Sequence, residues 1–264
     1  MKEFENKKQW ALILGGSSGL GLASAKKLAK HGLNICILHR SPRMREAIIS
    51  KEFESIKAPN IQFKAFNIDI TKPEKRQTVI DELTTSFGED HQIKVLVHSI
   101  AKGNLKPMVS EDGKVLQNDD FEITLNAMAL SLYDWTKAIF EAKLFADDCR
   151  IISFTSEGNT KAWRNYAAVS AAKVTLEAIS RSIALEFAPF GIKANCIQAG
   201  VTDTASLRLI PGSEKMIEYT IKRNPNGRLT TPEDVANVVY LLTKDEASWI
   251  TGTVIPVDGG EHLR

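Results

Sequence analysis

Short apolar runs alternate with longer amphipathic stretches along the whole chain. Seven of these runs are almost continuously apolar, a pattern typical of parallel strands that are buried on both faces. We therefore expect β-strands at residues 10–14, 34–38, 61–66, 93–98, 150–154, 192–197 and 253–257.

Five of the intervening stretches carry apolar residues at helical spacing. Two of them begin near a proline and two stop at a glycine, as helices commonly do. Repeated strand–helix units imply a doubly wound parallel α/β sheet of the Rossmann type, with about seven strands and helices on both faces. The predicted helices cover residues 20–32, 73–88, 118–145, 167–187 and 232–245.

The chain has the length of one sizeable domain. Its 264 residues are 43% hydrophobic, which is enough to bury one core, and no linker or low-complexity segment divides them. We expect a single domain over residues 1–264. The longest stretch without a predicted strand is 199–252, and its first part, 199–228, is expected to form a substrate loop and lid.

Charge and cysteine usage narrow the class of partner. The 34 basic and 32 acidic residues give a net charge of +2, which does not favour nucleic acid. Cys36, Cys149 and Cys196 are too widely spaced to indicate a metal cluster or a disulfide framework, and they suit a reducing compartment. The apolar runs are too short for a signal peptide or a membrane span. We expect a cytoplasmic protein without a metal, nucleic-acid or membrane partner.

A glycine-rich loop follows the first predicted strand and opens the first helix. Gly15, Gly19 and Gly21 have the spacing G-x3-G-x-G. Glycines permit a tight turn and let the backbone approach a pyrophosphate at the helix N-terminus. A glycine loop alone is a weak signal, since an ordinary strand-to-helix turn also uses glycine. Its position after the first strand favours dinucleotide binding.

A tyrosine and a lysine mark the second candidate site. Tyr166 and Lys173 are seven positions apart, nearly two helical turns, so both side chains project from one helix face. A buried lysine can hold a phenol in a reactive electrostatic environment, and the phenol can then stabilise a developing oxyanion. Tyr133, Tyr219 and Tyr240 occupy core-like or mobile positions, so Tyr166 is the best candidate for the proton donor.

These features resemble the short-chain dehydrogenase/reductase family over nearly the whole length of the chain. Asp69, Asn126 and Ser156 also match the family, as do segments 199–204, 226–236 and 249–260. Two departures stand out: Leu14 precedes Gly15 where threonine is usual, and H-S-I-A replaces N-N-A-G at 98–101. Members with V-H-S-I-A at this place are typically enoyl-thioester reductases.

The position of the tyrosine departs from the family pattern. The family serine lies seventeen positions before the lysine, which is Ser156 here, and the usual tyrosine lies four before it, at Val169. Valine cannot donate a proton, and Tyr166 stands three residues earlier. The Y-x6-K spacing resembles enoyl-[acyl-carrier-protein] reductases, and Ser156 brings the chain closest to the NADPH-dependent enoyl reductase III group. This resemblance implies catalytic roles for Tyr166, Lys173, Ser156 and Asn126.

Cofactor choice is determined at the end of the second strand. A carboxylate there would hold the ribose hydroxyls of NAD, whereas an arginine would pair with the 2′-phosphate of NADP. His39 occupies the acidic position and Arg40 and Arg43 follow it, which favours NADPH over the alternative of a solvated basic turn. The resemblance implies further cofactor contacts at Gly15, Ser17, Ser18, Gly19, Leu20, Gly21, Asp69, Ile70, Ser99, Ile100, Ala101, Lys173, Gly200, Val201 and Thr204.

The longer gap has a chemical rationale. In carbonyl reduction the proton goes to the oxygen on the carbon that receives the hydride. In an enoyl thioester the hydride goes to the β-carbon and negative charge develops on the more distant thioester oxygen. A phenol displaced along the helix suits the second geometry. This geometry favours reduction of a trans-2-enoyl thioester, and the resemblance implies that the thioester is carried on acyl carrier protein, as in fatty acid synthesis.

The acidic carrier predicts a basic approach surface. Candidates are Lys161, Arg164, Arg208, Lys215, Lys222 and Arg223, although each also fits an ordinary solvated face. An acyl-chain wall is expected from Ala205, Leu207, Leu209, Ile210, Met216 and Ile217, which could instead anchor the lid. The resemblance implies a homotetramer assembled through helices 118–145 and 166–188 and the C-terminal strand.

Two other functions fit the same residues. One is reduction of a 3-oxoacyl thioester or another carbonyl by a Tyr166 that reaches nearer the hydride. The other is a nucleotide-binding sensor without catalysis, which Leu14 and the altered 98–101 segment would allow. The retained Ser156 and Lys173 argue against the sensor.

Overall fold

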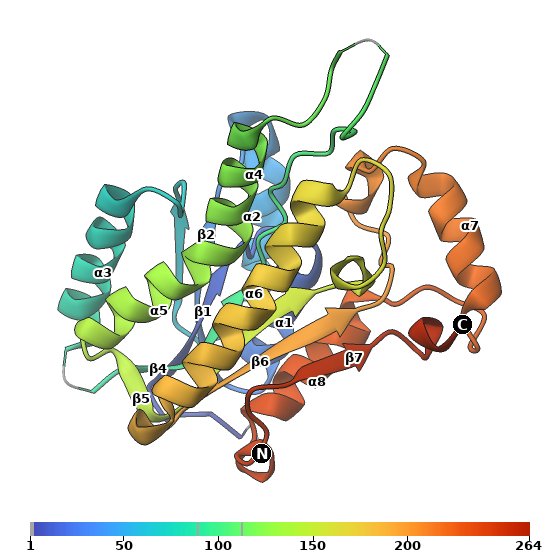
Figure 1. Cartoon of the computed structure of the whole chain (residues 1–264). Coiled ribbons are helices and arrows are strands. Elements are labelled where there is room, and N and C mark those ends of the chain that lie inside the picture. The colour runs from blue at the N-terminus through green and yellow to red at the C-terminus, as the bar shows by residue number, and fades with distance from the viewer. Residues whose placement is uncertain (1–2, 89, 112) are drawn as a thin grey trace.

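A computed structural model describes residues 3–88, 90–111 and 113–264. The described residues form one seven-stranded parallel sheet in the order β3-β2-β1-β4-β5-β6-β7 (Figure 1). The predicted Rossmann-type sheet is therefore confirmed. The strands are β1 (Gln9–Leu14), β2 (Asn34–His39), β3 (Phe63–Asn67), β4 (Gln92–His98), β5 (Phe145–Thr155), β6 (Ile192–Ala199) and β7 (Val254–Val257).

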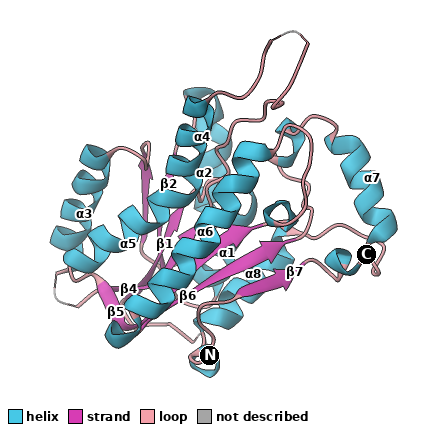
Figure 2. Ribbon diagram, in the orientation of Figure 1, coloured by secondary structure: helices cyan, strands magenta, loops and turns pink. Residues whose placement is uncertain are grey.

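Helices cover both faces of the sheet (Figure 2). One hydrophobic cluster joins the sheet to α1, α2 and α8, and a second joins its other face to α3, α5 and α6. Among the described residues, no helix has both the length and the apolar character needed to cross a bilayer. The helices are α1 (Gly19–Lys30), α2 (Glu46–Glu54), α3 (Pro73–Phe87), α4 (Asn118–Leu125), α5 (Ser131–Glu141), α6 (Ala167–Glu186), α7 (Ser213–Arg223) and α8 (Pro232–Thr243).

Strand β1 shows why the apolar runs are continuous. Trp10, Leu12 and Leu14 belong to the cluster beneath α3, α5 and α6, whereas Ala11 and Ile13 belong to the cluster beneath α1 and α8. Successive side chains of a strand point to opposite faces, and here both faces are covered. The run therefore lacks the polar alternation of a half-exposed strand.

The helix predicted over 118–145 is interrupted and ends early. α4 gives way to a π-helical turn (Asn126–Leu130), and α5 then runs only to Glu141. Lys143 takes a positive φ of 56°, and Phe145 pairs with Ile93 of β4. The last residue of the predicted helix, Phe145, therefore belongs to β5, and residues 142–144 form the turn before it. The hydrophobic pattern also did not predict α2 and α7.

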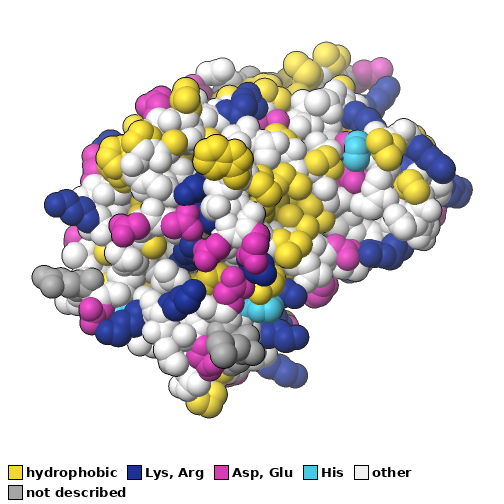
Figure 3. All heavy atoms as spheres, turned by 90° about the horizontal axis from the view of Figure 1, so that it is seen from below, with side chains coloured by type: hydrophobic (Ala, Val, Ile, Leu, Met, Phe, Trp, Pro, Cys, Tyr) yellow, Lys and Arg dark blue, Asp and Glu magenta, His cyan; other side chains and the backbone are white. Residues whose placement is uncertain are grey.

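Charged side chains of both signs lie on the face seen from below. Figure 3 shows acidic and basic side chains intermixed there, together with exposed apolar side chains. This mixture agrees with a net charge of only +2.

All three cysteines are free and buried. Cys36 lies in β2, Cys149 in β5 and Cys196 in β6. Burial raises the pKa of each thiol. The reactive thiolate is therefore scarce at neutral pH, and these side chains serve as core residues.

Strand order reverses between β1 and β4. The chain runs to β2 and β3 on one side of β1 and to β4 through β7 on the other. In parallel sheets such a reversal leaves a crevice outside the carboxyl ends of the strands, where ligands bind.

The turn between Phe190 and β6 is closely packed, and its left-handed glycine can be tested by substitution. Gly191 has a φ of +74°, and a Cβ there would lie 1.7 Å from the Asp147 carbonyl oxygen. Gly212 has a similar φ of +80° but meets nothing within 4 Å. We expect Gly212→Ala to cost about 1 kcal/mol from the left-handed backbone alone, and Gly191→Ala to cost about 3 kcal/mol because the backbone must also shift. Urea unfolding would measure both, and equal losses would contradict this account.

Candidate active site

A cavity of about 530 Å³ lies at the carboxyl ends of the strands. Its lining includes the glycine loop, Tyr166, Lys173 and residues of the 199–228 segment that is predicted to form a lid. The crevice left by the reversal of strand order is thus the place where the sequence-predicted groups meet. The described residues bring no three His, Cys, Asp or Glu side chains together in a metal-binding arrangement.

The glycine loop has the geometry of an anion site. Ser18 is the N-cap of α1, but its side chain makes no capping hydrogen bond, so the first amides of the helix keep their donors. Gly15 has a φ of +87°, and a Cβ there would lie 2.2 Å from the Ser99 carbonyl oxygen. A Cβ at Gly21 would lie 2.3 Å from the Gly15 carbonyl oxygen. Glycine at positions 15 and 21 therefore allows α1 and the loops after β1 and β4 to pack directly against one another.

Two residues with separately predicted roles form one ion pair. The Arg40 guanidinium donates to Asp69 at 2.6 Å. Partial burial alone would raise the pKa of Asp69, but hydrogen bonds from Thr71 and Arg40 and the charge of Lys102 lower that pKa to about 2. Asp69 is therefore ionised, and it holds Arg40 at the rim where the cofactor residues were predicted.

The end of β2 also presents hydroxyl groups. His39 Nδ1 lies 3.0 Å from Ser41 Oγ, which donates to Ser17 Oγ at 3.3 Å. Burial lowers the pKa of His39, so its ring is neutral at pH 7. Sequence reasoning missed Ser41, whose place beside Ser17 depends on the close approach of two loops.

Tyr166 stands at the start of α6 and not inside it. The helix begins at Ala167, and Tyr166 is its N-cap with φ −117° and ψ 0°. The Tyr166 carbonyl accepts the Ser170 amide at 2.8 Å, and the preceding Asn165 has a φ of 64°. The predicted placement of both side chains on one helix face was therefore only approximate, because the turn before the helix also sets the direction of the phenol.

Lys173 is buried and fixed to the sheet. Its Nζ donates to the Phe154 carbonyl of β5 at 2.7 Å. Burial lowers the pKa of Lys173 to about 8, and the nearby Cys196 and Glu177 oppose that shift. His98 is equally buried, with Nε2 2.8 Å from Ser131 Oγ, and burial lowers its pKa to about 3. His98 is therefore a neutral packing residue.

The Tyr166 phenol and the Ser156 hydroxyl lie together in the cavity. Burial raises the pKa of Tyr166, and the neighbouring Ser156 hydroxyl partly lowers it. Ser156 Oγ is nevertheless a buried atom that completes no well-formed hydrogen bond to the described residues. Gly158 makes room for the ring, since a Cβ there would lie 2.5 Å from Tyr166 Cε1. The pair therefore presents two hydroxyl groups to the cavity.

An apolar wall surrounds the phenol. Val169 packs with Met128, Tyr166 and Ala172, and Trp163 lies against this cluster. A Cβ at Gly103 would come within 2.6 Å of Val169 Cγ2, so this wall is closely packed. The position that holds the proton donor in the resembling family is therefore part of an apolar surface here.

Most of the other predicted site residues line the cavity, with three exceptions. Asn126 begins the π-helical turn and does not line the cavity, although Ala127 and Met128 do. Gly21 lies inside α1 against the Gly15 carbonyl, and Ile217 is also absent from the cavity wall. The predicted residues that line it are Gly15, Ser17, Ser18, Gly19, Leu20, Arg40, Asp69, Ile70, Ser99, Ile100, Ala101, Ser156, Tyr166, Lys173, Gly200, Val201, Thr204, Ala205, Leu207, Leu209, Ile210 and Met216.

The predicted basic approach surface was wrong for Arg223. Its side chain is only 7% exposed and is paired with Glu157 and Glu261, because the last turn of α7 packs on the loop after β5. Lys161 also pairs with Glu157, and Arg208 pairs with Asp203. The remaining candidates Arg164, Lys215 and Lys222 are exposed.

The buried ammonium predicts a pH-dependent stability. The unfolded chain binds the Lys173 proton up to the ordinary pKa of 10.5, whereas the folded protein releases it at about 8. The cost of burying the cation is therefore full below pH 8 and disappears as the pH rises toward 10. Urea unfolding followed from pH 7 to 10 should show wild type gaining about 2 kcal/mol relative to Lys173→Met. Parallel profiles for the two proteins would contradict the buried charge.

The chain matches the family model described as Enoyl-(Acyl carrier protein) reductase over residues 15–262. The 3-oxoacyl-[acyl-carrier-protein] reductase of Escherichia coli (strain K12) is 28% identical over 255 residues, 96% of this chain and 97% of the relative. A probable 2,4-dienoyl-CoA reductase of Bacillus subtilis (strain 168) is 28% identical over 261 residues, 97% of each chain.

Solved structures show the same fold. The Bacillus cereus enoyl-acyl carrier protein reductase, determined with NADP+ and indole naphthyridinone, has a TM-score of 0.87. It is 22% identical, and the likeness covers 100% of this chain and 99% of that one. Since the family model spans nearly the whole chain, the protein is an oxidoreductase of the short-chain dehydrogenase/reductase superfamily and belongs to the family described as enoyl-(acyl carrier protein) reductase.

Proposed function

We propose that this protein reduces the trans-2 double bond of an enoyl thioester, with NADPH as its cofactor and acyl carrier protein as the carrier. One observation carries the proposal: the only phenol that lines the cavity among the described residues is Tyr166, while Val169 forms apolar wall. The phenol thus sits at the displaced position, in the same cavity as Ser156 and the buried Lys173.

The residues at the glycine-loop end fit a dinucleotide. Free amides at the start of α1 and the close approach at Gly15 suit a pyrophosphate. Arg40 is 60% exposed at the end of β2, and no carboxylate stands at His39 to favour a free ribose hydroxyl. Arg40, Ser17 and Ser41 would hold the 2′-phosphate, and Lys173 would bind the nicotinamide ribose. When bound, NADPH supplies the hydride.

Tyr166 and Ser156 act on the substrate oxygen. The raised pKa of Tyr166 keeps the phenol protonated at neutral pH, so it can donate a hydrogen bond as negative charge develops on the thioester oxygen. Ser156 Oγ, which lacks a well-formed partner, supplies a second donor. Lys173, mostly protonated below its pKa of about 8, lowers the cost of that charge. Trp163, which lines the same cavity, helps to exclude water.

Substrate and subunit contacts follow from the lid and the exposed helices. Leu207, Ile210 and Met216 line the cavity and would contact the acyl chain, with Lys215 and Lys222 facing the acidic carrier. Exposed apolar side chains on the long helices support assembly as a homotetramer. They are Ile123, Leu130, Tyr133, Val174 and Leu185.

Reduction of a 3-oxoacyl thioester is the second candidate. It is favoured by the similarity to 3-oxoacyl-[acyl-carrier-protein] reductases. Parallel assays with NADPH and crotonyl, longer enoyl and 3-oxoacyl thioesters separate the two. Turnover of the 3-oxoacyl substrates alone would select the second candidate, and tight NADPH binding without any turnover would reject both.

Removal of the Tyr166 hydroxyl tests the proposed donor. Tyr166→Phe should lower kcat for crotonyl thioester about 100-fold, the usual contribution of a positioned proton donor, while NADPH still binds in a fluorescence titration. Tyr133→Phe, on an exposed part of α5, is the matched control. Full activity of Tyr166→Phe would remove the phenol from the mechanism.

Removal of the Arg40 guanidinium tests cofactor choice. Arg40→Ala should raise KM for NADPH about tenfold relative to KM for NADH, because it deletes a charged contact to the phosphate and leaves Asp69 with only the more distant Lys102 as a cationic partner. Arg45→Ala, five positions along and also exposed, should leave the ratio unchanged. An unchanged ratio in Arg40→Ala would refute phosphate recognition by Arg40.

A further inference from the structure

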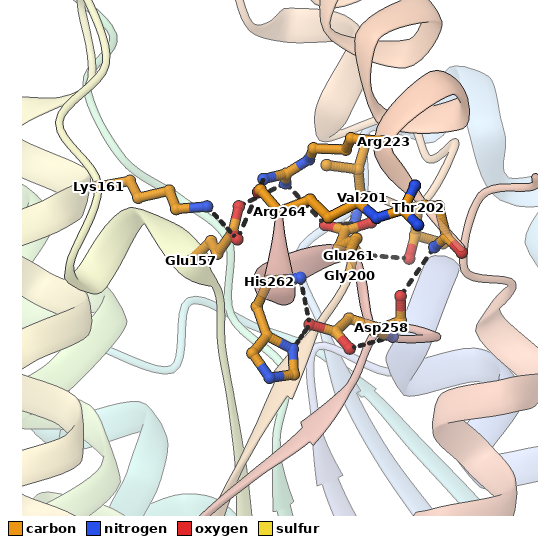
Figure 4. Close-up of polar contacts among 12 residues, drawn as sticks. Glu157, Lys161, Gly200, Val201, Thr202, Arg223, Asp258, Glu261, His262 and Arg264 are labelled. Atoms are coloured by element: carbon orange, nitrogen blue, oxygen red, sulfur yellow. Dashed lines mark hydrogen bonds and ion pairs between the residues drawn. The ribbon is translucent and has the colours of Figure 1, made fainter. Parts of the chain in front are cut away.

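A buried ionic cluster lies where the C-terminal end of α7 packs on the loop after β5. Its centre is Arg223, the last residue of α7. The guanidinium holds Glu157 with both terminal nitrogens: Nη1 donates to Oε1 at 3.2 Å, and Nη2 donates to Oε2. Nη2 also donates to Glu261 Oε1 at 3.3 Å. Figure 4 shows the three side chains converging from separate segments.

Each arm of the cluster ends at the cavity. Glu157 directly follows Ser156, and Glu261 accepts the Val201 backbone amide at 3.0 Å. Both carboxylates line the cavity. The third arm is α7, which carries Met216 of the cavity wall. One guanidinium therefore connects the serine loop, the loop after β6 and the lid.

The arrangement of Arg223, Glu157 and Glu261 is more specific than the stability of the fold alone requires. A buried ion pair is weak support for stability, since apolar residues of similar volume often replace it without loss. Here Arg223 Nε and Glu261 Oε2 are buried and have no hydrogen-bond partner among the described residues. The planar two-pronged pairing fixes orientation as well as distance, which a lysine at this position would not do.

We propose that Arg223 is a positioning residue that couples the lid to the catalytic segment. By holding Glu157 and Glu261 together, it fixes the Ser156 hydroxyl and the Val201 backbone relative to α7. An acyl chain that seats against α7 thereby also sets the serine loop. The inference rests on the proposed function for its link to turnover. The contacts of Arg223 with Glu157 and Glu261 do not depend on which reaction the protein catalyses.

Arg223→Met tests the coupling in the full-length protein. Amide hydrogen exchange should accelerate in peptides covering 156–165 and 200–210. With crotonyl thioester, kcat should fall about 100-fold, the effect of a misplacement of about 1 Å, while KM changes about threefold or less. Arg223→Lys keeps the charge without the two-pronged contact and should give intermediate values. Arg228→Met removes an exposed pair with Asp234 and should change neither measurement.

A combined variant separates positioning from charge burial. R223M/E157Q/E261Q removes the carboxylates that R223M leaves without a cation, so its melting temperature should recover while kcat stays low. Recovery of kcat, or unchanged exchange in R223M, would overturn the proposal. If R223M does not fold, Glu157→Gln and Glu261→Gln should each raise exchange in the same peptides. If wild type does not reduce enoyl thioesters, the proposed function fails while the exchange result still decides the coupling.

Discussion

The reversal of strand order between β1 and β4 determines where the cavity of this protein forms. Because the connections diverge on either side of this point, the carboxyl ends of the strands border an open crevice. Glycine at position 15, with its carbonyl neighbour at Ser99, closes one side of that crevice. Lys173 is tied to Phe154 on the other side. The chemistry of the site is therefore fixed to the sheet at both ends.

The sequence was most informative where a local rule decides the structure. Strands buried on both faces give continuous apolar runs, so all seven could be located. Helical spacing brought Tyr166 and Lys173 together, and the family resemblance added Ser156. All three line one cavity because they lie on or beside α6 and the loop after β5. The exact direction of Tyr166 was not accessible, because it depends on the left-handed backbone at Asn165.

Contacts between distant segments were beyond the reach of the sequence. Arg223 and Glu157 are 66 positions apart, and nothing in either neighbourhood distinguishes a buried pair from two solvated charges. The same holds for Arg40 and Asp69, which lie 29 positions apart and were assigned independent partners. Arg40 and Asp69 follow β2 and β3, and Glu157 follows β5, whereas Arg223 ends α7. The hydrophobic pattern encodes neither pairing. Such contacts need the tertiary fold.

Within the site, burial shifts the pKa values of Tyr166 and Lys173 in opposite directions. It favours the neutral phenol of Tyr166 and disfavours the charged ammonium of Lys173. The burial of the thiols has a practical consequence of another kind. Since Cys36, Cys149 and Cys196 are all buried, the native protein should react only slowly with maleimide reagents. A single cysteine introduced on the exposed side of α7 would carry a spectroscopic label selectively, with the wild-type interior left intact.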